Sequence, residues 1–126
     1  RNSIRVGPRY QGIVLLGAAM LSPLRAEIGI EVTSARPIRE ANSRYSAARA
    51  PLEEWYAQVA EADWPTPAAV NRQFGDASIL KASRVVFNIA GNKFRLVVKI
   101  NYPYRVVYIR FVGTHDEYDA IDAGTV

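Results

Sequence analysis

Apolar and polar positions alternate most regularly in the C-terminal third of the chain. Every second residue is apolar or aromatic from Phe94 to Tyr102, and the segment from Val106 to Thr114 alternates in the same way. A period of two places successive side chains on opposite faces of a strand. With RVVFNI at 84–89 and turn residues at Gly91–Asn92 and Pro103, the pattern predicts three strands in an antiparallel meander.

The two later strands each have one apolar face and one face with basic side chains. Strict alternation places on one face of the first strand Phe94, Leu96, Val98, Ile100 and Tyr102, and on the other Lys93, Arg95, Val97, Lys99 and Asn101. In the second strand it separates Val107, Ile109 and Phe111 from Tyr108, Arg110, Val112 and Thr114. Apolar faces must be covered, so we expect helices on one side of the sheet and the cations together on its exposed side.

The segments before this meander predict a short strand and three helices. IGIEVT at 28–33 alternates and is rich in branched residues, whereas apolar residues recur at helical spacing over 36–45 and from Pro51 to Trp64. A third helix is expected over 67–74, with Thr66 as its N-cap. The predicted fold is therefore α+β, with N-terminal helices packed on one face of a mainly antiparallel, three- to four-stranded sheet.

Length and composition indicate one globular domain. The chain has 126 residues, of which 49% are hydrophobic, and we assign residues 29–126 to the domain and residues 1–28 to an N-terminal extension. The apolar run at 13–21 is too short for a bilayer-spanning helix, so no membrane association is expected. Without cysteine and with a single histidine, the chain fits a reducing cytoplasm, and neither a metal nor another cofactor is expected.

Charge is distributed unevenly along the chain. Residues 40–76 contain six acidic and three basic side chains, whereas residues 78–114 contain no acidic side chain. The basic residues of that later segment are Lys81, Arg84, Lys93, Arg95, Lys99, Arg105 and Arg110. Arginine binds phosphate oxygens in pairs and lysine acts as a compact positive charge, so a phosphate-binding face is one interpretation. A solvated sheet face and a docking site for an acidic protein segment are the alternatives.

His115 is the candidate for proton transfer. It is the sole histidine and stands just after the last predicted strand, in GTHDEY, and imidazole titrates near neutral pH. The same position suits an ordinary histidine at a helix start, with Thr114 as the N-cap. Tyr108 and Tyr118 suit either base stacking or packing. The sequence contains no P-loop, dinucleotide fingerprint or nucleophile elbow.

Two long segments, RVVFNIAGNKFRLVVKINY and VVYIRFVGTHDEYDAID, resemble the HigB toxins, which are mRNA interferases of the RelE-like superfamily in type II toxin–antitoxin pairs. The resemblance covers about Val32 to Val126. It implies a cytoplasmic endoribonuclease that cuts mRNA on translating ribosomes and is silenced, in a hetero-oligomer, by a HigA-like helix-turn-helix antitoxin. RelE-like enzymes use no metal, and their ribose 2′-hydroxyl attacks the adjacent phosphate to leave a cyclic phosphate and a 5′-hydroxyl.

The resemblance also assigns candidate residues. Arg95 matches the sheet arginine of the superfamily, His115 falls where many relatives carry an arginine, and Asn88 lies near the position of a lysine used by some relatives. The catalytic candidates are Arg95, His115, Lys93 and Tyr118, and the candidates for binding RNA or phosphate are Arg110, Lys99, Arg84, Asn88 and Tyr108. A non-catalytic module that binds RNA or the ribosome, or an adaptor that docks an acidic protein, is the alternative function.

Overall fold

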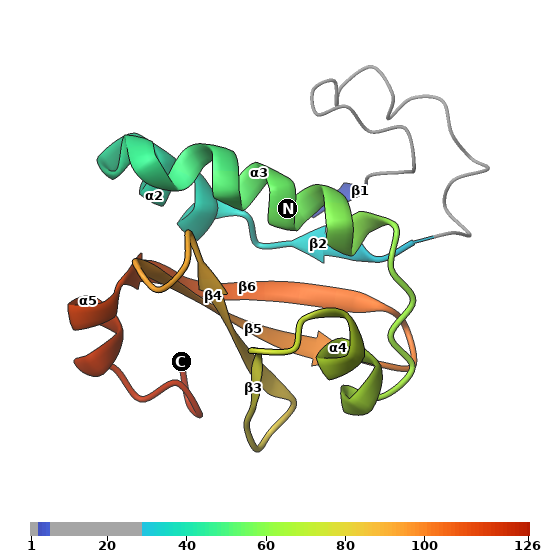
Figure 1. Ribbon diagram of the computed structural model, residues 1–126. Helices are drawn as coiled ribbons and strands as arrows, with labels where there is room; N and C mark the ends of the chain where they lie inside the picture. The colour runs from blue at the N-terminus through green and yellow to red at the C-terminus, as the bar shows by residue number, and fades with distance from the viewer. Residues whose placement is uncertain (1–2, 6–28) are drawn as a thin grey trace.

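The computed structural model describes residues 3–5 and 29–126 (Figure 1). Its elements are β1 (Ser3–Arg5), β2 (Glu31–Thr33), α2 (Arg36–Arg44), α3 (Ser46–Ala60), α4 (Pro67–Gln73), β3 (Ser78–Ile79), β4 (Arg84–Ile89), β5 (Phe94–Asn101), β6 (Val106–Thr114) and α5 (His115–Asp119). The N-terminal extension predicted for residues 1–28 lies outside the described residues, except for β1. No helix of the described segments is long and apolar enough to cross a membrane.

One mixed sheet contains all the strands of the described residues, in the order β1-β2-β6-β5-β4-β3. The predicted meander is confirmed, since β4, β5 and β6 pair antiparallel with their neighbours in sequence. The opening strand, expected over 28–33, is observed only over Glu31–Thr33. This strand, β2, pairs parallel with β6. The short edge strands β1 and β3 extend the sheet beyond the three or four strands expected. The prediction of an α+β fold with a mainly antiparallel sheet is confirmed.

Helices α2 and α3 cover one face of the sheet, where α2 contacts β6 and α3 contacts β4 (Figure 1). The core between the layers is centred on Phe87 of β4. Its ring centroid lies 5.3 Å from that of Trp55, 6.0 Å from that of Trp64 and 5.0 Å from that of Phe74. These partners come from α3, from the segment after it and from the end of α4, so this one strand residue contacts three separate parts of the helical region.

Helix α3 begins earlier than the sequence predicts. It starts at Ser46 and contains Pro51, which was expected to be its first residue. Proline has no backbone N–H to donate to the preceding turn, which disfavours it inside a helix. Here a buried stripe of Ala48, Leu52 and Trp55 continues past the proline on the core side, and this burial outweighs the lost hydrogen bond. Helix α4 does begin as predicted, after a Thr66 cap.

A β-bulge at Arg110 corrects the predicted faces of β6. Val97 pairs with Phe111 and Val98 with Ile109, so Arg110 has no partner residue on β5. An extra residue in one strand reverses the alternation beyond it. Val112 therefore packs in the core beneath the helices, while Phe111 lies on the opposite side of the sheet. The sequence had assigned these two residues the other way round.

We call the side of the sheet away from α2 and α3 the outer face. Its middle is apolar, because Val86 and Val97 are buried there together with the partly buried Phe111. The C-terminal segment covers this apolar area with Tyr118, Ile121, Ala123 and Val126. Figure 1 shows α5 and the segment that follows it across the sheet from α3. The outer face is thus not the continuous cationic surface that the alternation predicted.

Candidate nucleic-acid interface

The strand register divides the predicted site residues into two groups on the outer face. Asn88 and Arg95 are paired across β4 and β5, and Arg84 and Lys99 are paired farther along the same strands. The covered apolar area lies between the two pairs. We define the Arg95 group as Asn88, Lys93, Arg95, His115 and Tyr118. We define the Lys99 group as Arg84, Lys99, Tyr108 and Arg110.

Arg95 is held in place by uncharged partners. Its Nη1 donates to the main-chain oxygen of Asn92 at 3.2 Å, and its guanidinium carbon lies 5.9 Å from the ring centroid of Tyr118. The side chain is half-buried, and it forms no ion pair with any described carboxylate. A guanidinium fixed in this way keeps its charge and most of its donors for an added anion.

His115 is the first residue of α5, and Thr114 caps that helix as predicted. The Thr114 hydroxyl accepts a hydrogen bond from the Glu117 amide, while the Glu117 side chain accepts one from the Thr114 amide, which together form a capping box. His115 itself is exposed, and its Nδ1 lies 3.3 Å from a carboxylate oxygen of Asp119. The predicted helix start is confirmed; a role in proton transfer stays a prediction.

Glu117 anchors α5 to the helical layer, which the sequence did not predict. One carboxylate oxygen accepts hydrogen bonds from Arg44 and from the Tyr45 hydroxyl, the latter at 2.8 Å. The other oxygen accepts the Thr114 amide at 2.9 Å. A Cβ added at Gly113 would lie 2.5 Å from that same oxygen, so glycine is needed for the close approach. These contacts set the position from which His115 and Tyr118 project.

The same contacts make the stability of the fold depend on Glu117 at acid pH. The Thr114 amide, the Tyr45 hydroxyl and the Arg44 guanidinium hold the pKa of Glu117 below its ordinary value of 4.5. A lowered carboxyl pKa stabilises the fold above the unfolded-state pKa, and that contribution disappears as the pH falls through the folded-state pKa.

We therefore expect Glu117→Gln to lower the free energy of unfolding at about pH 7 and to have a smaller effect as the pH falls toward about 3, because the Glu117 carboxyl of the parent takes up a proton as the pH passes below its folded-state pKa. Urea unfolding of the two proteins at both pH values measures this difference. Glu53→Gln, at an exposed position of α3, is the matched control and should show no such pH dependence. A Glu117→Gln penalty of equal size at both pH values would contradict the role given to the carboxylate.

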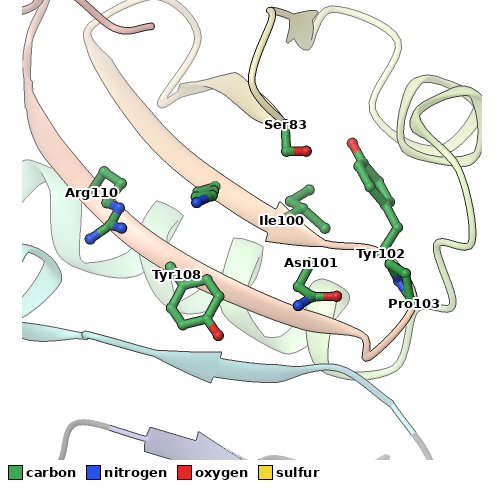
Figure 2. A pocket seen from close by; sticks show the side chains of 8 residues that line it. Ser83, Ile100, Asn101, Tyr102, Pro103, Tyr108 and Arg110 are labelled. Carbon is green, nitrogen blue, oxygen red and sulfur yellow. The ribbon is translucent and has the colours of Figure 1, made fainter. Parts of the chain in front are cut away.

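Three members of the Lys99 group, all except Arg84, line a depression of about 350 Å³ on the outer face (Figure 2). Its lining consists of Ser83, Lys99, Ile100, Asn101, Tyr102, Pro103, Tyr108 and Arg110. Lys99 is paired with Tyr108 across the two strands, and the guanidinium carbon of the bulged Arg110 lies 5.9 Å from the Tyr108 ring centroid. Neither cation forms an ion pair within the described part of the chain. The depression is therefore a positively charged surface with an aromatic side chain.

Arg84, Arg105 and Asn88 already bond to other groups of the protein. Arg84 donates to the main-chain oxygens of Ala82 and Val126. Arg105, which the sequence counted with the sheet cations, forms an ion pair with Asp63. Asn88 donates to the carboxylate of Asp76 at 3.2 Å. Acidic residues from the preceding helical region thus reach a sheet whose own sequence contains none between 78 and 114.

Among the described residues, one group of side chains has a spacing that would suit a metal ion. His115, Asp116 and Asp119 each offer a ligand atom, and these atoms lie within 4.8 Å of one another. All three side chains are exposed, and exposed carboxylates commonly gather without an ion. We assign them no metal-binding role.

Comparison with known proteins supplies the family. Residues 48–121 match the model of the HigB toxins, described as RelE-like toxic components of a toxin–antitoxin system. A protein of Escherichia coli O6:H1 named mRNA interferase HigB is 23% identical over 94 residues, which cover 73% of this chain and 91% of the relative. The family match includes both groups of site residues and most of the helical layer. The chain therefore belongs to the HigB toxin family and is a RelE-like toxin of a toxin–antitoxin system.

Proposed function

We propose that this toxin is an mRNA interferase, a metal-independent endoribonuclease that acts in the cytoplasm on mRNA held by translating ribosomes. The name of the Escherichia coli relative supports the activity. The observation that carries it is Arg95, which is fixed on the outer face between Asn92 and Tyr118 with no described carboxylate to neutralise it. Beside it, α5 begins with the sole histidine of the chain.

In the proposed reaction, the ribose 2′-oxygen attacks the adjacent phosphorus and the bond from phosphorus to the 5′-oxygen breaks. The 2′-hydroxyl loses a proton, the departing 5′-oxygen gains one, and the products are a 2′,3′-cyclic phosphate and a 5′-hydroxyl. Negative charge grows on the phosphoryl oxygens during this step, so preorganised cations lower the barrier. We assign this role to Arg95 and to Lys93, which is exposed in the adjoining hairpin.

His115 and Tyr118 are the groups proposed to move the protons. The contact between His115 Nδ1 and Asp119 favours a proton on Nδ1 and leaves Nε2 to accept one from the 2′-hydroxyl. Tyr118 follows His115 by three residues and therefore lies on the same side of α5, with its ring against Arg95. The Lys99 group would bind the neighbouring phosphates of the same RNA strand.

A toxin of a toxin–antitoxin system has an antitoxin as its partner. We propose a HigA-like helix-turn-helix protein in this role, in a hetero-oligomer with the toxin. Its gene would lie beside the toxin gene, and co-purification of the two products is the direct test. Recovery of the toxin alone from cells that express both genes would contradict this assignment.

Mapping the ends of mRNA fragments tests the activity. After induction of the full chain we expect new fragments with 5′-hydroxyl and 2′,3′-cyclic phosphate ends, and the His115→Gln variant should produce far fewer of them. Growth arrest without new RNA ends would favour the alternative of a module that binds RNA or the ribosome. Neither new ends nor RNA binding would favour an adaptor for an acidic protein.

A further inference from the structure

The lining of the depression beside Lys99 combines two kinds of chemistry. Lys99 and Arg110 supply positive charge, and Ser83 and Asn101 supply uncharged hydrogen-bonding groups. Tyr108 lies between Arg110 and Asn101 in Figure 2. Phosphate requires the first kind of surface and a base edge requires the second, so the lining resembles what one nucleotide would need. The volume of about 350 Å³ is within the usual range of small-ligand pockets.

The side-chain amide of Asn101 is fixed in one orientation. Its Oδ1 accepts a hydrogen bond from the Tyr104 amide at 3.1 Å, so the oxygen faces the turn and the nitrogen faces away. Figure 2 shows the nitrogen on the side of Tyr108 and the oxygen on the side of Pro103. No described residue accepts a hydrogen bond from Nδ2. Asn101 therefore offers an added ligand a donor, while its acceptor is already occupied.

Ser83, which also lines the depression, is held by a strained turn. Ala82 and Ser83 have φ values of 58° and 61°, in the left-handed region that non-glycine residues avoid. The Ser83 carbonyl accepts the Ile100 amide at 2.9 Å, which ties this turn to β5. Strained backbone of this kind is concentrated at functional sites. The Ser83 hydroxyl is exposed and has no hydrogen-bond partner among the described residues.

We propose that this depression is a nucleotide subsite in which Lys99 and Arg110 bind a phosphate and Asn101 selects a base with a carbonyl acceptor, uracil or guanine, over adenine. The bidentate pairing of asparagine with adenine needs both its donor and its acceptor, and the acceptor of Asn101 is taken. A single donor instead complements a base carbonyl, and the Ser83 hydroxyl can donate or accept beside it. This inference rests on the proposed function, because it names an RNA feature recognised on the same face of the sheet as the cutting site.

Equilibrium binding to single-stranded RNA tests the subsite. The probes are hexamers of uridine and of adenosine with 2′-O-methyl sugars, which lack the attacking hydroxyl and so cannot be cut. Asn101→Asp keeps an oxygen for the Tyr104 amide but turns the donor into an acceptor, which suits the amino group of adenine. We expect this change to lower the ratio of uridine affinity to adenosine affinity by about three- to tenfold.

Gln58→Glu is the matched control, because it adds the same charge at an exposed position of α3, on the other side of the sheet. It should leave the affinity ratio unchanged. The negative charge that Asn101→Asp adds also weakens phosphate binding, but this loss is the same for both hexamers and cancels in the ratio. An affinity ratio that is equal in the parent and in Asn101→Asp would overturn the subsite. Mapping of mRNA fragment ends tests the nuclease activity separately. If new 5′-hydroxyl ends appear but Asn101→Asp leaves the affinity ratio unchanged, only the subsite is refuted. If Asn101→Asp changes the affinity ratio but no new RNA ends appear, only the nuclease activity is refuted.

Discussion

Replacing Arg95 with alanine is expected to slow mRNA cleavage by about 10²- to 10³-fold, because one preorganised donor of this kind is worth about 2.7–4 kcal/mol of barrier. Arg95 is half-buried, with Asn92 and Tyr118 as its partners. It lies at the margin of the covered area rather than in the main core, so the variant should remain folded. Single-turnover cleavage of a defined mRNA on ribosomes measures the loss, and thermal unfolding checks the fold.

Two further variants separate the possible causes of that loss. Arg95→Lys keeps the charge but removes the planar fork and weakens the contact with the Tyr118 ring, so it should recover only part of the rate. Arg49→Ala removes a cation from an exposed position of α3 and should cleave at the parental rate. If Arg95→Ala cleaves as fast as the parent while remaining folded, Arg95 has no place in the chemistry.

Local patterns predicted much of this fold. A period of two identified β5 and β6, the run RVVFNI before the Gly91–Asn92 turn identified β4, and the caps Thr66 and Thr114 marked helix starts that the structure contains. These signals depend on residues that are neighbours in sequence, which is why they could be interpreted without a structure. The predicted helix start at Pro51 was wrong. Proline locally disfavours a helix interior, but the buried face of α3 packs against residues of distant strands, and this packing extends the helix back to Ser46.

The geometry of the site depended on contacts that the sequence does not display. The bulge at Arg110 shifts one strand relative to its neighbour, and nothing in an alternating pattern marks a position that lacks a cross-strand partner. The C-terminal segment covers Val97 and Phe111, so the predicted cationic face becomes two groups. The sequence showed which types of side chain the site would contain. Their division into two groups could be seen only in the folded chain.

Contacts with residues distant in sequence explain why a count of basic residues overestimated the number of cations available to bind phosphate. The seven cations between residues 78 and 114 suggested one continuous phosphate-binding surface. Arg105 instead meets Asp63, and Arg84 donates to two main-chain oxygens. Lys99, Arg110 and Arg95 are the strand cations that lie on the outer face, form no ion pair with a described carboxylate and keep a terminal nitrogen that donates to no described group. Phosphate binding is therefore expected to depend chiefly on these three, together with Lys93 of the adjoining hairpin.

Loss of the Phe87 ring should remove toxicity without touching the outer face. Phe87→Ala is expected to cost about 3–5 kcal/mol of the free energy of unfolding, the usual range for a buried phenylalanine. Its ring is 1% exposed and contacts Trp55, Trp64 and Phe74, so truncation leaves a cavity between the helices and the sheet. A loss of this size is comparable to the entire stability of a small domain.

Urea unfolding followed by the fluorescence of the two tryptophans measures the Phe87 effect, because both indole rings contact that side chain. Phe87→Leu should lose less stability, since it fills part of the cavity. Tyr104→Ala removes an aromatic ring that is 77% exposed and should change stability by less than about 0.5 kcal/mol. Equal losses in Phe87→Ala and Tyr104→Ala would show that the helical layer does not depend on Phe87. A Phe87→Ala protein that is as stable as the parent but has lost toxicity would show instead that Phe87 affects the site on the outer face other than through the stability of the fold.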